Sequence, residues 1–103
     1  MIKTLVLVPI RDNDGQAFGP ADWDLLERKL LERFGGFTGG GMADGAWSDN
    51  GKVYRDTSRR YEVALSSWNQ LPDWLAIVHW IRAHFRQIAL YIEVAGVPEI
   101  IGE

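Results

Sequence analysis

The chain has 103 residues, and we expect residues 1–103 to form one domain around a single hydrophobic core. Hydrophobic residues make up 47% and charged residues 24%, as in ordinary globular proteins, and no run approaches the ~20 apolar residues of a membrane span. The net charge of −3 argues against nucleic acid as a partner, and the absence of cysteine excludes disulfides, thiol catalysis and thiolate metal sites.

The first element is predicted to be a strand. Residues 3–10, KTLVLVPI, are aliphatic and β-branched with little polar alternation, as in a buried central strand. The apolar run is short for a secretory signal and lacks a small-residue cleavage site. We therefore expect a cytoplasmic protein that has no membrane partner.

A helix is predicted over residues 20–34. Pro20 stands at its first turn, where a missing N–H is harmless, and Gly35-Gly36 supplies a left-handed stop. One apolar stripe follows at spacings of three and four residues, formed by Trp23, Leu26, Leu30 and Phe34.

The glycine-rich segment 33–52, RFGGFTGGGMADGAWSDNGK, matches neither common phosphate-binding motif. In the dinucleotide pattern G-x-G-x-x-G, the third glycine position falls on Asp44. In the P-loop pattern, Val53 stands where a hydroxyl is required. A phosphate cradle is therefore not expected here.

The same segment predicts a β-hairpin. Asn50-Gly51 is a strong two-residue turn signal because both residues tolerate positive φ. We expect residues 39–41 to be a flexible or tightly turned lead into a strand at about 43–48, which pairs with a strand at 52–65. In the second strand, alternation predicts one covered face formed by Tyr61, Val63 and Leu65.

A second helix and a further strand complete the predicted order. The helix is expected over residues 72–87, with a buried stripe of Trp74, Ile77, Val78, Ile81 and Phe85. In the strand at 88–94, one face holds Leu90, Ile92 and Val94 and the other Tyr91 and Glu93. The tail VPEIIGE is expected to add at most a short edge segment.

This order, β-α-β-β-α-β, predicts an α+β domain of the ferredoxin-like type. It consists of two layers, a four-stranded antiparallel sheet with both helices on one face. The other sheet face would be bare in a monomer, so we expect a homodimer. Tyr61, Tyr91 and Trp47 are the candidate interface residues.

Residues 34–58 resemble a family of small bacterial domains of uncharacterised function. The family pattern is F-x-G-x-T, a glycine-rich gap, G-x-W, and then G-x-x-x-R-E-x-S. The corresponding residues read FGGFT at 34–38, GAW at 45–47, and Gly51 followed by RDTS at 55–58. Asp56 stands where the family has glutamate, which keeps the charge and shortens the reach. The resemblance supports the fold more than a function.

The candidate ligand site lies in the predicted hairpin. An arginine there offers a planar fork of donors for a carboxylate or phosphate, and aromatic side chains can wall such a site. The alternative is an ordinary solvated strand with cross-strand ion pairs. The candidate residues are Trp47, Tyr54, Arg55, Asp56 and Arg59.

No metal or cofactor is expected. His79 and His84 are five residues apart and point to different sides of one helix, so they do not form a ligand pair. The strands also lack the glycine-aromatic pattern of RNA-recognition domains.

Two classes of function fit these features. The first is a small binding or interaction module, whose open sheet face takes a second copy, a protein partner or an anionic ligand. The alternative is a cofactor-free acid–base enzyme, with Asp56 or a histidine as proton carrier and Arg55 or Arg59 as the anion clamp.

Overall fold

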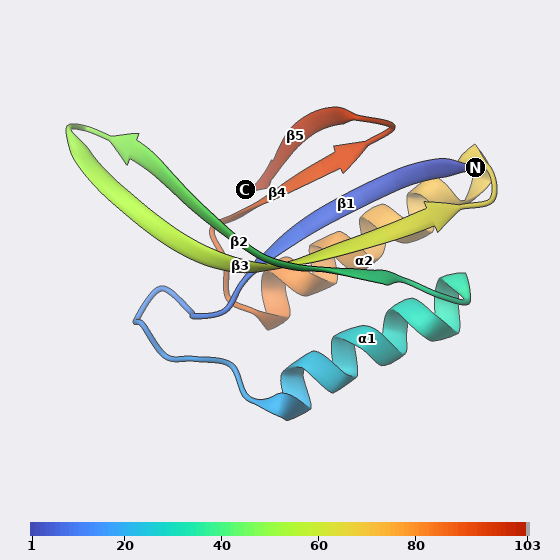
Figure 1. The fold of residues 1–103 in the computed structure, drawn as a ribbon, viewed down its shortest axis with the longest axis horizontal. Helices are drawn as coiled ribbons and strands as arrows, with labels where there is room; N and C mark the ends of the chain where they lie inside the picture. Colours follow the sequence, from blue (N-terminus) through green and yellow to red (C-terminus); the bar gives the residue numbers. More distant parts are fainter. Residues whose placement is uncertain (103) are drawn as a thin grey trace.

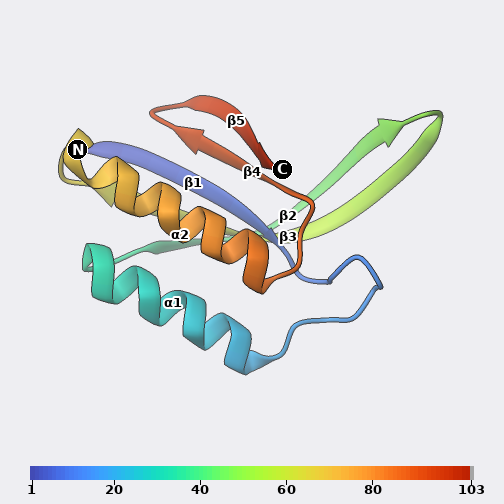
Figure 2. The same cartoon turned by 180° about the vertical axis from the view of Figure 1, so that it is seen from behind.

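A computed structural model describes residues 1–102 as an α+β fold with one sheet and two helices. The elements in chain order are β1 (Ile2–Pro9), α1 (Pro20–Phe34), β2 (Thr38–Asp49), β3 (Lys52–Leu65), a 3-10 turn (Trp68–Gln70), α2 (Leu71–His84), β4 (Ala89–Val94) and β5 (Val97–Gly102). The sheet is antiparallel, in the order β2-β3-β1-β4-β5. Both helices lie on one face of it (Figures 1 and 2). Within the described residues, neither helix is long and apolar enough to cross a bilayer.

The prediction of four strands was wrong, because the tail forms a fifth. β5 pairs with β4 along its whole length, from Val94↔Val97 to Ala89↔Gly102. The two strands are joined by Ala95 and Gly96, whose φ angles are 52° and 81°. Alanine rarely adopts a positive φ, so this turn was not predicted from the sequence.

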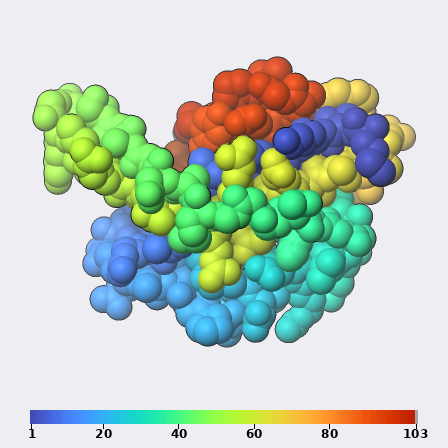
Figure 3. Space-filling view, in the orientation of Figure 1, coloured from blue at the N-terminus to red at the C-terminus, as the bar shows by residue number. Residues whose placement is uncertain are grey.

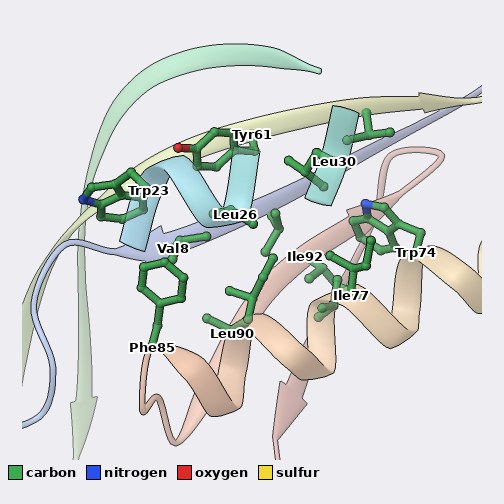
Figure 4. Close-up of a cluster of buried hydrophobic side chains, with 14 of the residues drawn as sticks. Val8, Trp23, Leu26, Leu30, Tyr61, Trp74, Ile77, Phe85, Leu90 and Ile92 are labelled. Carbon is green, nitrogen blue, oxygen red and sulfur yellow. The ribbon is translucent and has the colours of Figure 1, made fainter. Parts of the chain in front are cut away.

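The core lies between the sheet and the helices, and both predicted helical stripes contribute to it (Figure 4). α1 begins and ends where predicted, whereas α2 ends at His84 because Arg86 adopts a φ of 50°. Tyr61 is only 3% exposed and belongs to this core, so its assignment to a dimer interface was wrong. The pairing Val6↔Tyr61 places both side chains on the helix-covered face.

The β2–β3 hairpin is longer than predicted, since β2 already begins at Thr38. The glycines expected to lead into the strand form an irregularity within it, where the register shifts between Gly39 and Met42 and Gly41 has a φ of 79°. The Arg60 side chain packs closely over Gly40, and a Cβ there would lie 2.7 Å from its Cδ, so this side chain would have to move.

The outer half of this hairpin, residues 44–57, extends beyond β1, whose pairing with β3 ends at Pro9↔Ser58 and is followed only by a hydrogen bond from the Ile10 N–H to the Thr57 carbonyl at 3.0 Å. We call it the hairpin arm. The predicted Asn50-Gly51 turn is confirmed, with φ angles of 51° and 78°. In Figures 1 and 3 the arm projects away from the rest of the molecule.

Candidate active-site pocket

The five predicted site residues divide between the two faces of the hairpin. Successive side chains of a strand point to opposite faces, so Tyr54 and Asp56 lie on one face of β3 and Arg55 and Arg59 on the other. Trp47 pairs with Tyr54 and shares its face. Arg55 is exposed on the arm. The five residues therefore do not converge on one concavity.

Trp47, Tyr54 and Asp56, which share one face of the hairpin arm, form a local cluster. The rings of Trp47 and Tyr54 stack with centroids 4.4 Å apart, and Lys52 Nζ lies 5.0 Å from the Tyr54 ring. The indole Nε1–H of Trp47 donates to Asp56 Oδ2 at 3.3 Å. Trp47 remains 53% exposed. Cross-strand pairing of this kind stabilises a hairpin without any ligand.

Arg59 instead faces α1, where the structure contains a cavity of about 340 Å³. The loop before α1 supplies one wall, the first two turns of α1 supply another, and β3 contributes Arg59. The lining residues are Phe18, Pro20, Trp23, Asp24, Glu27 and Arg59.

Glu27 is held in this pocket by Tyr61. The Tyr61 hydroxyl donates to Glu27 Oε2 at 2.7 Å, and Arg59 Nη1 lies 3.9 Å from the same oxygen. Burial and the adjacent Glu27 carboxylate both raise the pKa of Tyr61 above its ordinary value. The phenol therefore stays protonated and keeps the carboxylate oriented.

Aromatic rings pack together beside the same region. Trp23 and Tyr61 stack with centroids 6.4 Å apart, and both are drawn side by side in Figure 4. Phe18 and Trp23 meet edge to face with centroids 6.2 Å apart, and Phe37 stacks against Tyr61 at 5.6 Å. The Arg59 guanidinium carbon lies 4.2 Å from the centroid of Trp23. Of these rings only Phe18 and Trp23 line the cavity, beside the charged groups of Glu27 and Arg59.

The loop that carries Phe18 is fixed by its own polar residues. Asp12 Oδ1 accepts hydrogen bonds from the backbone N–H groups of Asp14 and Gln16, a turn geometry that aspartate favours. Arg86 Nη2 donates to Asp12 Oδ2 at 3.1 Å, which ties the loop to the end of α2. The Ile10 N–H donates to the Thr57 carbonyl of β3 at 3.0 Å, so the loop is anchored to the sheet as well as to the second helix.

Glu27 and the role of Tyr61 in the site were not predicted from the sequence. A usable signal was present, because Glu27 follows Trp23 by four residues on one side of a helix, and Tyr61 follows Arg59 by two residues on one face of a strand. What the sequence did not reveal is that these two surfaces meet.

A second polar cluster joins the first turn of α1 to the last turn of α2. His84 Nε2 lies 2.8 Å from Asp22 Oδ1, and Asp22 Oδ2 accepts the backbone N–H of Gly19 at 3.1 Å. The hydrogen bond from His84 is the main cause that lowers the pKa of Asp22. Trp80 stacks on the His84 ring at 4.8 Å, whereas His79 is exposed elsewhere on α2. Among residues 1–102, no three acidic or histidine side chains are grouped as metal ligands.

Solved structures with a similar fold were found. A phage SAM lyase in complex with S-methyl-5'-thioadenosine superposes with a TM-score of 0.72 at 15% identity, over 99% of this chain and 89% of that chain. The apo state of a phage SAM lyase gives a TM-score of 0.68 at 16% identity, with the same coverage. At this level of identity the likeness shows a shared fold. No protein-family model and no curated protein matches the chain.

Proposed function

We propose that this protein is an enzyme whose substrate, an adenosine-bearing sulfonium compound such as SAM, is held in the pocket between α1 and β3. The observation that carries the proposal is the 2.7 Å hydrogen bond from Tyr61 to Glu27, which orients a carboxylate beside aromatic rings in a cavity of about 340 Å³. An oriented carboxylate can pair with a substrate cation or accept a proton. The rings of Phe18 and Trp23, which line the cavity, suit the flat base of an adenosine.

The charges of the pocket favour a cationic ligand over the anionic one expected from the sequence. Two carboxylates, those of Asp24 and Glu27, face one guanidinium, that of Arg59. The negative side therefore prevails, and a sulfonium or ammonium is attracted. In this proposal Glu27 takes the role that sequence analysis gave to Asp56 or a histidine.

The similar fold of the phage SAM lyase structures supports the choice of substrate class, and the transfer of that class to this chain is our proposal. We also keep three predictions from the sequence as proposals. These are the ferredoxin-like arrangement of the first six elements, the resemblance of residues 34–58 to the small bacterial domain family, and a cytoplasmic location.

The test is a ligand-dependent stability measurement combined with a turnover assay. S-adenosylmethionine should raise the melting temperature, since a ligand that binds only the native state stabilises it. Chromatography should detect the cleavage of its bond between sulfur and the aminocarboxypropyl chain, which leaves S-methyl-5'-thioadenosine and releases the four-carbon amino-acid fragment as the second product. Glu27→Gln should weaken binding at least about tenfold, the worth of a charge-assisted interaction.

Glu32→Gln is the matched control, because Glu32 is exposed on the same helix and does not line this cavity. It should leave binding and turnover unchanged. The proposal fails if neither S-adenosylmethionine nor S-methyl-5'-thioadenosine changes the melting temperature of the wild-type protein.

We also propose a homodimer formed through the sheet face that the helices leave uncovered. Trp47 and Ile100, which are 53% and 63% exposed, lie on that face. Burial of such side chains against a second copy removes apolar surface from water. Light scattering tests it, and a mass of one chain of 11.7 kDa across micromolar concentrations would contradict it.

A further inference from the structure

The Arg59 side chain occupies the part of the pocket best suited to a cation. Its guanidinium carbon lies 4.2 Å from the centroid of Trp23, in the range of a cation–π contact. Its Nη1 also lies 3.9 Å from the Glu27 carboxylate. A positive group at this position is therefore attracted by both an aromatic face and an acidic side chain.

We infer that in the free protein the Arg59 guanidinium occupies the position of the ligand's cationic group. When the ligand binds, the guanidinium leaves this position. This inference rests on the proposed function and assigns the specificity of its pocket. The cationic centre of the ligand would take the position between Trp23 and Glu27, and the arginine would swing into solvent. Arg59 would then be a gating residue that selects for a ligand able to replace its charge.

The contacts of Arg59 are compatible with this movement. A separation of 3.9 Å from Glu27 exceeds hydrogen-bond distance, so no close ion pair has to be broken. The side chain is 41% exposed and has a long flexible stem, which gives it a free path to solvent. Meanwhile Glu27 keeps its hydrogen bond from Tyr61, so the carboxylate stays in place when the guanidinium leaves.

We therefore expect the pocket to prefer a positively charged ligand over a neutral one of the same shape. A ligand that carries a sulfonium can replace the guanidinium at both Trp23 and Glu27. A neutral ligand of the same shape leaves Glu27 without a cation if it displaces Arg59, and desolvated charge without a partner is unfavourable. If Arg59 instead bound a carboxylate of the ligand, loss of Arg59 would weaken binding.

Calorimetric titration separates these roles. Arg59→Met keeps the apolar stem and removes the competing charge, so S-adenosylmethionine should bind about two- to fivefold more tightly, the worth of the contact that is no longer displaced. The affinity for neutral S-methyl-5'-thioadenosine should stay within about twofold of wild type. Arg59→Lys keeps the charge and should fall between the two proteins.

Arg28→Met is the matched control. Arg28 is exposed next to Glu27 in sequence and does not line the cavity, so its loss changes net charge alone. The inference is overturned if Arg59→Met weakens the binding of S-adenosylmethionine, or if Arg28→Met produces the same gain.

A second probe keeps this test independent of the substrate assigned above. If S-adenosylmethionine binds none of these proteins, that substrate is wrong, and the cation site is tested with trimethylsulfonium instead. Its titration, followed by the NMR signal of the Trp23 indole, should saturate at lower concentration in Arg59→Met than in wild type. No shift of that signal in either protein would overturn the inference.

Discussion

The Tyr61 hydroxyl and the Glu27 carboxylate meet at 2.7 Å although they are 34 residues apart in the chain. The bond joins the inner face of β3 to α1 beside the cavity, and it connects the core to the candidate active site. Tyr61 has two roles as a consequence. Its ring packs with Trp23 and Phe37, and its hydroxyl orients the carboxylate to which we assign the chemistry.

Tyr61→Phe is expected to lower the free energy of unfolding by about 1–2 kcal/mol, because a hydrogen bond to a charged group is lost while the ring still packs. Turnover should fall as well, since Glu27 loses its orienting partner. Urea denaturation measures the first effect. Tyr91→Phe is the control, because its hydroxyl bonds Glu93 at 2.9 Å away from this pocket, and it should leave turnover unchanged. Equal turnover in both variants would contradict the role of Tyr61.

The Asp22–His84 pair predicts a pH dependence of stability. The pKa of Asp22 is lowered in the folded protein, chiefly by the hydrogen bond from His84, so its contribution to stability is present above the unfolded value of 3.8. The contribution is lost as the pH falls through the lower folded value. The difference in unfolding free energy between wild type and Asp22→Asn should therefore shrink towards pH 2. A difference that stays constant from pH 6 to pH 2 would contradict this.

Gly40→Ala should destabilise the protein by about 1 kcal/mol, the lower end of the cost of overpacking. The new Cβ would lie 2.7 Å from Cδ and 2.9 Å from Cγ of Arg60, and that side chain has to move. Gly45→Ala on the same strand is the control, since a Cβ there meets nothing within 4 Å. Thermal denaturation of both variants tests the prediction, and removal of the Arg60 side chain in Gly40→Ala/Arg60→Ala should restore part of the loss.

Trp74→Ala should cost about 3–5 kcal/mol, because Trp74 is 1% exposed in the core and its removal leaves a cavity. Trp68→Ala provides the comparison, as Trp68 is 58% exposed and its loss should change stability by less than about 1 kcal/mol. Denaturant titration of both variants is the measurement. Similar losses for the two would mean that the core is placed wrongly.

The amino-acid sequence by itself determined the elements with a local cause. The helix over residues 20–34 follows from its apolar stripe and from Pro20 and Gly35, which act within one or two turns. The Asn50-Gly51 turn follows from the tolerance of both residues for positive φ. The alternation along β4 follows from the two-residue period of a strand.

Tertiary structure decided which side chains meet. The fifth strand formed through a turn with Ala95, which carries no sequence signal, and pairing with β4 outweighed local preference there. Likewise, strand alternation separates Arg55 and Arg59 from Asp56, but only the packing of α1 against β3 brings Arg59 to Trp23 and Glu27. Such contacts depend on the relative placement of a helix and a sheet across more than 30 residues of chain, as the Tyr61–Glu27 separation of 34 shows. No local propensity encodes that placement, because it results from the packing of the whole core.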